Sequence, residues 1–205
     1  MTLLDHLPSL RQAATPRIDP SVWPLTAAVD DLGRLCVGDV PLTEIADEFR
    51  TPIYVLDETD FRTRLQRYRT ALPGVDVVYA SKSLLCTGVA RWATEAGAGL
   101  DVSSAGELAT ALVAGADPAR IVMHGNAKSV DELRDAAVIG VGRIVVDSLM
   151  DIAYLSCEAR QPLRLLVRVT PDVDVHGYAA VMTGVNDQKF GFTLGDGHAA
   201  EAVKR

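Results

Sequence analysis

Cysteine is scarce in this sequence of 205 residues, which contains only Cys36, Cys86 and Cys157. Their spacing matches neither a disulfide framework nor a set of metal ligands. Such isolated cysteines fit thiols that stay reduced in a reducing compartment. The sequence therefore predicts no structural zinc site and no other metal site.

Long apolar runs are also missing. Runs such as residues 111–116 and 136–141 fall far short of the roughly 20 residues needed to span a bilayer. The amino-terminal stretch places Asp5, His6 and Pro8 where a signal peptide needs an unbroken apolar segment. We therefore expect a cytoplasmic protein with no membrane partner.

An excess of basic residues is absent as well. Twenty Lys and Arg residues stand against 27 Asp and Glu residues, which gives a net charge of −7, and the basic residues are scattered. A nucleic-acid backbone requires clustered positive charge, so nucleic acid is not an expected partner. The composition, 48% hydrophobic and 23% charged, is that of a core-forming chain and excludes disorder, collagen and coiled coil.

The first part of the chain has little regularity. Residues 1–35 hold four prolines and no sustained periodicity, which predicts an extended lead-in. Hydrophobic spacing then predicts strands at 35–40 and 51–55 and helices at 41–49 and 58–72. We place a domain boundary between an amino-terminal extension, residues 1–55, and a larger domain, residues 56–205.

The larger domain repeats one pattern. Strand-like segments begin at Val75, Gly99, Ile121, Arg143 and Leu163, at offsets of 24, 22, 22 and 20 residues. A helical pattern follows each of the first four. Three of these helices begin with a Ser-x-x-acid capping box, at Ser104 and Glu107, Ser129 and Glu132, and Ser148 and Asp151. This alternation predicts parallel βαβ units.

Two α/β folds use such units, the doubly wound sheet and the (β/α)8 TIM-type barrel. The turn after the first strand, ASKSLLC, lacks the G-x-G-x-x-G of dinucleotide-binding sheets, which favours the barrel. Three further units would need more than the 35 residues that follow Thr170. We therefore expect an incomplete barrel of about five of the eight units, in a chain that stops before the barrel closes.

Polar residues follow the predicted strands at the ends that form the active face of a barrel. They are Lys82, Asp101, Ser103, His124, Asn126, Asp147 and Arg168. Strand alternation places Lys82 on the inner face, above Val78 and Ala80. Loss of hydration there favours the neutral amine, which attacks an aldehyde to form a Schiff base. The alternative is a lysine at a strand end that faces solvent.

The other candidates have simple structural alternatives. Asp101 could balance Lys82 or bind backbone N–H groups, and Glu107 could serve only its capping box. His124 could act as a general base, stack on a flat cofactor, or pack as an ordinary histidine. Arg168, between two valines, needs an anionic partner. In the long loop after it, the spacing of Asp172, Asp174, His176 and Lys189 indicates nothing firm.

Six motifs in order resemble those of one enzyme family. They are YASKS at 79–83, LDVSSAGEL at 100–108, HGNAKS at 124–129, VVDS at 145–148, LVRVTPDVDVH at 166–176 and QKFGF at 188–192. Together they resemble the diaminopimelate decarboxylases, which are barrel-fold enzymes dependent on pyridoxal phosphate. The resemblance runs from about Trp23 to the last residue.

The resemblance implies that pyridoxal phosphate is the cofactor and that Lys82 is the Schiff-base lysine. It places Asp101 close to that lysine, and His124 and Arg168 near the cofactor. It implies decarboxylation of meso-2,6-diaminopimelate to L-lysine and CO2, by a homodimer when full length. In the resembling enzymes a stacking histidine, a glycine-rich phosphate loop, an acidic partner for the ring nitrogen and a β domain with a catalytic cysteine come later. Without them we expect the isolated chain to be inactive.

Two alternatives to this function stay open at this point. The chain could be a non-catalytic remnant of a barrel, or a binding module, in which Lys82 has no chemical role. It could also belong to a decarboxylase of another basic amino acid or of a carboxylated polyamine.

Overall fold

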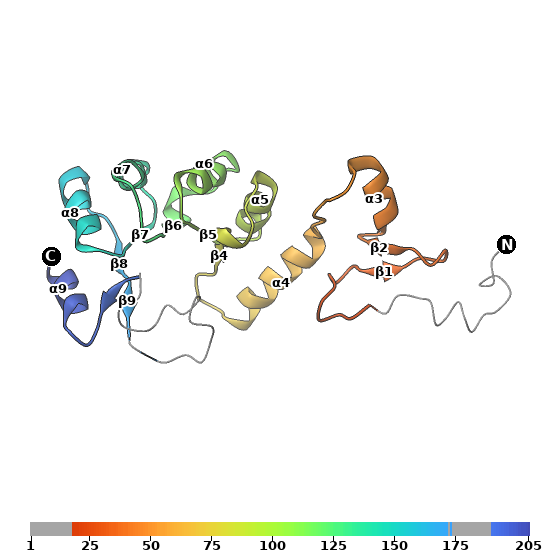
Figure 1. Cartoon of the computed structure of the whole chain (residues 1–205), viewed down its shortest axis with the longest axis horizontal. Helices are drawn as coiled ribbons and strands as arrows, with labels where there is room; N and C mark the ends of the chain where they lie inside the picture. Colours follow the sequence, from red (N-terminus) through yellow and green to blue (C-terminus); the bar gives the residue numbers. More distant parts are fainter. Residues whose placement is uncertain (1–17, 172, 174–189) are drawn as a thin grey trace. The chain divides into compact units, whose positions relative to one another are not determined.

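The computed structural model in Figure 1 describes residues 18–171, 173 and 190–205. The chain divides into two compact units, Met1–Ala71 and Leu72–Arg205. Of the sequence expectations, those on residues 1–17 and on Asp172, Asp174, His176 and Lys189 lie outside the described residues.

From residue 18 on, where the structure describes it, the first unit contains a small antiparallel sheet, in the order β1-β2-β3, and two helices. Its elements are β1 (Ala28–Val29), β2 (Leu35–Val37), β3 (Val40–Pro41), α3 (Leu42–Phe49) and α4 (Glu58–Ala71). The strand predicted at 35–40 is a hairpin, because Gly38 and Asp39 both have positive φ, as a tight hairpin turn requires. The lead-in predicted over residues 1–35 contributes β1.

Two predictions for this unit need correction. The strand predicted at 51–55 is absent. Pro52 has no N–H to donate to a ladder, and Tyr54 is exposed. The helix predicted at 41–49 is present as α3, yet none of its residues is buried. Periodicity thus placed the helix correctly but overstated how much of its apolar face is covered.

The second unit is built on a parallel sheet of five strands in the order β4-β5-β6-β7-β8. The strands are β4 (Val78–Ala80), β5 (Gly99–Val102), β6 (Ile121–Met123), β7 (Arg143–Val146) and β8 (Leu165–Val167). The helices between them are α5 (Thr87–Glu95), α6 (Ala105–Val113), α7 (Val130–Ile139) and α8 (Leu149–Glu158). All four helices lie on the same side of the sheet (Figure 1). A doubly wound sheet reverses its strand order and has helices on both faces, so the predicted barrel-type arrangement is confirmed.

Short elements complete this unit. Two single-turn 3-10 helices, η1 (Ser81–Ser83) and η2 (Pro118–Arg120), follow β4 and precede β6. Beyond β8 lie β9 (Val169–Thr170), β10 (Phe192–Thr193) and α9 (His198–Lys204). β9 and β10 pair in parallel. The QKFGF stretch therefore ends in a strand that lies beside the segment containing Arg168.

The core lies between the sheet and the four helices. Leu100, Met123 and Val146 are fully buried on that side. Asp101, which alternates with Leu100 and Val102 along β5, is partly exposed and points to the other side. Asp101 thus lies on the face of the sheet that the four helices do not cover.

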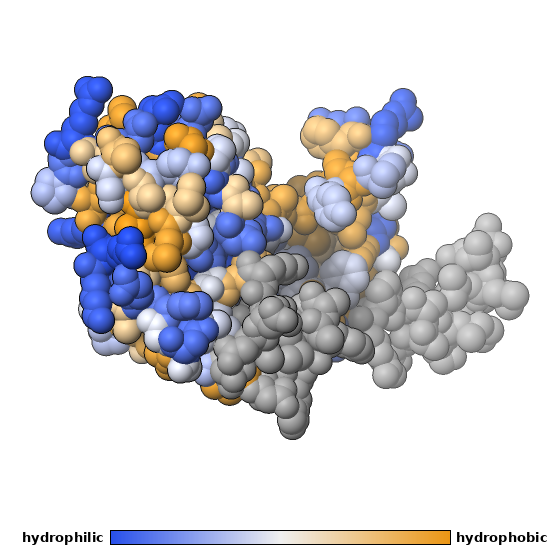
Figure 2. Space-filling view, turned by 60° about the vertical axis from the view of Figure 1, so that its left-hand side comes forward, coloured by the Kyte–Doolittle hydropathy of each residue, from blue (hydrophilic) through white to orange (hydrophobic). Residues whose placement is uncertain are grey.

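The last strand of the sheet lacks apolar cover among the described residues. Leu165 and Leu166 on β8 and Val169 on β9 are exposed. Figure 2 brings this end of the molecule forward and shows apolar side chains at the surface among charged ones. Uncovered apolar surface beside a sheet edge favours association with other protein surfaces.

The helix starts confirm the capping boxes in part. Ser104, Ser129 and Ser148 each accept a hydrogen bond from the backbone N–H three residues later. The reciprocal bond to the cap residue is complete only in α7, where Glu132 accepts from the N–H of Ser129. The carboxylates of Glu107 and Asp151 accept instead from the N–H of the residue before the cap. These acids therefore tie each helix to the strand that precedes it.

Candidate active site at the carboxyl ends of the strands

The predicted site residues lie at the carboxyl ends of consecutive parallel strands. Lys82 follows β4, Asp101 lies near the end of β5, His124 follows β6, Asp147 follows β7, and Arg168 follows β8. Because the strands run in parallel, these ends form one edge of the sheet. Ser103 and Asn126 lie in the loops at the same edge.

Lys82 lies in a turn that is braced by its neighbours. The hydroxyl of Ser83 donates to the carbonyl of Ala80 at 2.7 Å, and the hydroxyl of Tyr79 donates to the carbonyl of Leu84 at 2.8 Å. The prediction that strand alternation extends to Lys82 was wrong, because the chain turns into η1 at Ser81. Lys82 is exposed at the sheet edge, so the loss of hydration predicted for its amine is not observed.

Ser81 lies directly before this lysine and is buried. Its hydroxyl is the buried side-chain polar atom without a hydrogen-bond partner among the described residues. Buried hydroxyls usually find a partner. The turn therefore buries the side chain of Ser81 and exposes that of Lys82.

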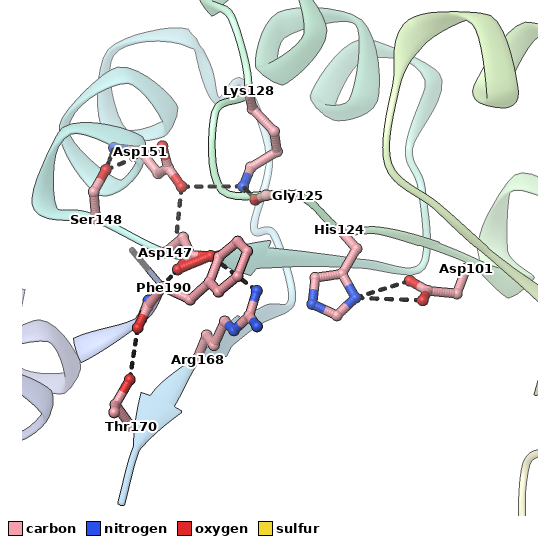
Figure 3. A network of polar contacts seen from close by, with 11 residues as sticks. Asp101, His124, Gly125, Lys128, Asp147, Ser148, Asp151, Arg168, Thr170 and Phe190 are labelled. Atoms are coloured by element: carbon pink, nitrogen blue, oxygen red, sulfur yellow. Dashed lines mark hydrogen bonds and ion pairs between the residues drawn. The ribbon is translucent and has the colours of Figure 1, made fainter. Parts of the chain in front are cut away.

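Asp101 and His124 form a pair. The Nδ1 atom of His124 lies 3.1 Å from one carboxylate oxygen of Asp101 and 3.3 Å from the other (Figure 3). A carboxylate can only accept, so a neutral imidazole here donates from Nδ1 and leaves Nε2 as an acceptor. The partner of Asp101 is thus a histidine 23 positions later, whereas sequence reasoning had considered Lys82 or the backbone.

Arg168 has the anionic partner that sequence reasoning required. Its Nη1 lies 3.3 Å from Oδ2 of Asp147, and its guanidinium carbon lies 4.3 Å from the centre of the Phe190 ring. The side chain of Asp147 is 2% exposed, and that of Arg168 is 26% exposed. Oδ1 of Asp147 accepts from the N–H of Gly191. A guanidinium carries five N–H donors, so Arg168 keeps capacity for another anion.

Sequence reasoning missed one ion pair at this edge, between Lys128 and Asp151. Nζ of Lys128 lies 3.1 Å from Oδ2 of Asp151, and both side chains are buried. Lys128 belongs to the HGNAKS motif, but nothing in the motif distinguishes this lysine from a solvated one. The signal available was Asp151, the acid of the capping box that begins at Ser148.

The structure therefore brings the candidates together in groups rather than in one cluster. Asp101 contacts His124, and Arg168 contacts Asp147. Between Lys82 and Asp101 or His124, no hydrogen bond or ion pair forms in the part of the chain that the structure describes. Ser103 donates through both its N–H and its hydroxyl to Glu107, so these two residues hold the start of α6.

Glu132 is held in its charged form by the helix start. The backbone N–H of Ser129 and then that of Ala105 bond to its carboxylate, and these hydrogen bonds place its pKa below the ordinary value despite partial burial. The bond from Ala105, at 2.9 Å, joins the first turns of α6 and α7. Because the pKa of Glu132 is lowered in the folded chain, its carboxylate stabilises the fold when it is ionised.

Glu132→Gln is expected to lower the free energy of unfolding at neutral pH. The free energies of unfolding of the variant and the original chain should differ at every pH above the ordinary Glu pKa of about 4.3. This difference should disappear as the pH falls through the lowered pKa of Glu132 in the folded chain. Urea unfolding between about pH 7 and pH 3 measures this. Glu48→Gln, at an exposed position on α3, is the control. An equal difference at every pH would contradict the assignment.

The described residues contain no cluster of metal ligands. Within them, no three His, Cys, Asp or Glu side chains group closely enough to hold a metal ion. Every described helix is too short or too polar to cross a membrane. The three cysteines are free thiols, Cys36 buried and Cys86 and Cys157 exposed.

Comparison with known proteins identifies relatives for most of the chain. The sequence profile of the family "Pyridoxal-dependent decarboxylase, pyridoxal binding domain" matches residues 58–205. A diaminopimelate decarboxylase of Actinosynnema pretiosum is 47% identical over 205 residues, which is 100% of this chain and 47% of that protein. A diaminopimelate decarboxylase of Mycobacterium bovis is 45% identical over 91% of this chain and 42% of that protein.

A solved structure has the same fold. The diaminopimelate decarboxylase of M. jannaschii, in complex with L-lysine, superposes with a TM-score of 0.76 at 26% identity. The match covers 88% of this chain and 44% of that one. The chain thus spans less than half the length of each of these relatives.

Proposed function

This chain belongs to the pyridoxal-dependent decarboxylases, and on that premise we propose that Lys82 is the residue that holds pyridoxal phosphate. The observation that carries the proposal is the position of an exposed primary amine at the sheet edge that also carries the Asp101–His124 pair. An amine in this position is accessible to an aldehyde. Lys82, Asp101, His124 and Arg168 are the proposed cofactor-binding residues.

The residues present fit this cofactor. Lys82 supplies the amine for the aldehyde carbon. The partly exposed guanidinium of Arg168 supplies N–H donors for an anionic group, and His124 supplies a flat ring beside the site. Pyridoxal phosphate, when bound, provides an electron sink for the electrons left by a broken carbon–carbon bond.

The protein side chains would orient the reactants and hold protons. Asp101 accepts a hydrogen bond from Nδ1 of His124 and so orients the imidazole. The other ring nitrogen, Nε2, is then free of this proton and would accept one as a base. Asp147 neutralises part of the charge of Arg168 and fixes the direction of its guanidinium. Phe190 covers one face of that guanidinium and limits its movement.

We propose that the reaction is the decarboxylation of meso-2,6-diaminopimelate to L-lysine and CO2. Support comes from the relatives named diaminopimelate decarboxylase, at 47% and 45% identity, and from the related structure solved with L-lysine. We also propose that the protein acts in the cytoplasm, as a homodimer when full length, without a nucleic-acid partner. The exposed apolar side chains of β8 and β9 are consistent with burial in a larger assembly.

The division into residues 1–55 and 56–205 is likewise a proposal. The family match begins at residue 58, close to the proposed boundary. The most compact division of the chain falls later, after Ala71, so α4 belongs to the barrel domain by family and to the first unit by contacts.

Covalent labelling tests the role of Lys82. Reduction with borohydride in the presence of pyridoxal phosphate is expected to attach the cofactor to the peptide that contains Lys82, as measured by mass spectrometry. Lys82→Ala should lose this label almost completely, because Lys128, at the same edge, is 1% exposed and paired with Asp151, and Lys204 lies away from the edge in α9. Lys204→Ala, at an exposed position in α9, should keep it. Equal labelling of Lys82 and Lys204 in the original chain would show that Lys82 is an ordinary surface lysine.

A chimera tests the reaction itself. Residues 1–205 would replace the matching segment of the Actinosynnema pretiosum enzyme, and CO2 release from meso-2,6-diaminopimelate would be measured. We expect activity that is lost with Lys82→Ala. Release from ornithine or lysine instead would move the proposal to another basic amino acid. A folded chimera that releases no CO2 from any of these would favour a non-catalytic module.

A further inference from the structure

Lys128 is a buried cation that the proposed chemistry does not use. Its side chain is 1% exposed, in the loop between β6 and α7, and its Nζ donates to the carbonyl of Gly125. Its ionic partner, Asp151, is 7% exposed in the first turn of α8. Burying two charges costs several kcal/mol in desolvation, and apolar side chains often replace such pairs without loss. The presence of this pair is therefore better explained by the backbone groups that it positions than by a contribution to the stability of the fold.

The pair joins two loops at the carboxyl edge of the sheet. On one side, Lys128 holds the carbonyl of the residue that follows His124. On the other side, Oδ2 of Asp151 accepts the backbone N–H of Asp147 at 2.9 Å. Figure 3 shows Lys128 extending from its own loop to Gly125 and Asp151, with His124 directly before Gly125 and Asp147 bonded to Asp151. One ammonium group thus contacts its own loop directly and reaches the loop of Asp147 through Asp151.

The backbone around His124 needs such a contact. The backbone N–H of His124 donates to the carbonyl of Val102 at 2.7 Å, and this bond holds the backbone of His124 against the end of β5. Gly125 then adopts a φ of +107°, where the chain leaves the sheet. Beyond this point the strand ladder gives no further support, and the contact from Lys128 to the Gly125 carbonyl holds the turn. Both contacts hold the backbone beside His124, whose imidazole bonds to Asp101.

We propose that Lys128 is a positioning residue, which sets His124 against Asp101 through the Gly125 carbonyl and sets Asp147 against Arg168 through Asp151. The effect on cofactor binding rests on the proposed function, whereas the effect on His124 does not. Lys128→Met leaves the carboxylate of Asp151 with the N–H of Asp147 and the hydroxyl of Ser148 as donors. We therefore expect this variant to fold.

Nitrogen NMR of the histidine rings tests the positioning in the chain without cofactor. The sequence holds four histidines, and His124→Gln assigns the relevant signal. In the original chain and in Lys204→Met, the ring should show a fixed tautomer with a hydrogen-bonded Nδ1–H. In Lys128→Met this signature should be lost while the unfolding transition stays cooperative. A general structural role would not alter the ring of one histidine.

Titration with pyridoxal phosphate gives the second readout. Lys128→Met should bind the cofactor about tenfold more weakly, a typical effect for residues that orient a binding group. If the original chain does not bind pyridoxal phosphate, the proposed function fails, and the histidine spectrum still decides the role of Lys128.

An unchanged His124 spectrum in folded Lys128→Met would overturn the inference. If this variant does not fold, Lys128→Met/Asp151→Leu, which removes both buried charges, gives the same test. The double variant should fold and lack the His124 signature. A native signature in it, or failure of both variants to fold, would show that the pair serves stability rather than positioning.

Discussion

Gly142→Ala is expected to destabilise the chain by about 3 kcal/mol, at the upper end of the usual range for overpacking. Gly142 lies directly before β7, and its N–H donates to the carbonyl of Pro118 at 2.8 Å. A Cβ atom there would lie 2.0 Å from the carbonyl oxygen of Ala119 and 2.7 Å from its carbonyl carbon. Both atoms belong to the backbone of η2, which cannot rotate away as a side chain could.

Urea unfolding of Gly142→Ala beside Gly195→Ala measures the effect. An added Cβ at Gly195 meets nothing within 4 Å, and its φ is not positive, so this control should stay within about 0.5 kcal/mol of the original chain. The loss in Gly142→Ala should appear as a lower midpoint with an unchanged slope. If both variants unfold at the same urea concentration, β7 does not pack against η2 as described.

Asp147→Asn is expected to lower the free energy of unfolding by about 3 kcal/mol, because it leaves a partly buried guanidinium without its anion. The carboxylate of Asp147 also accepts from the N–H of Gly191. In the same region, the N–H of Phe192 donates to the carbonyl of Arg168 at 2.8 Å, and the hydroxyl of Thr170 donates to the carbonyl of Phe190 at 2.6 Å. Asp147 therefore anchors the segment that contains β10 to the sheet edge.

Two measurements test this anchor. Hydrogen exchange of residues 190–205 should accelerate in Asp147→Asn more than exchange in β5 and β6, since the anchor is local. In a double-mutant cycle with Arg168→Met, the double variant should lose clearly less stability than the sum of the single losses. Additive losses, within about 0.5 kcal/mol, would contradict a direct pairing of Asp147 and Arg168.

The missed features of the site share one cause, their dependence on residues far along the chain. Asp101 and His124 are 23 positions apart, and their contact requires the register in which Asp101 lies beside Val122, two residues before His124. Lys128 forms its buried ion pair with Asp151, which lies 23 positions later in the first turn of α8. Neither the alternation nor the capping pattern contains this information.

By itself the sequence determined the local elements of this protein: the repeated strands, the helix starts at Ser104, Ser129 and Ser148, and the position of Lys82 just after a strand. Turns, caps and periodic apolar spacing act over a few residues, so they can be recognised without a fold. Only the tertiary structure decided which side chains are partners, that residues 51–55 form no strand, and that Lys128 is a buried cation. Strand register and burial depend on contacts between distant segments, which local patterns do not encode.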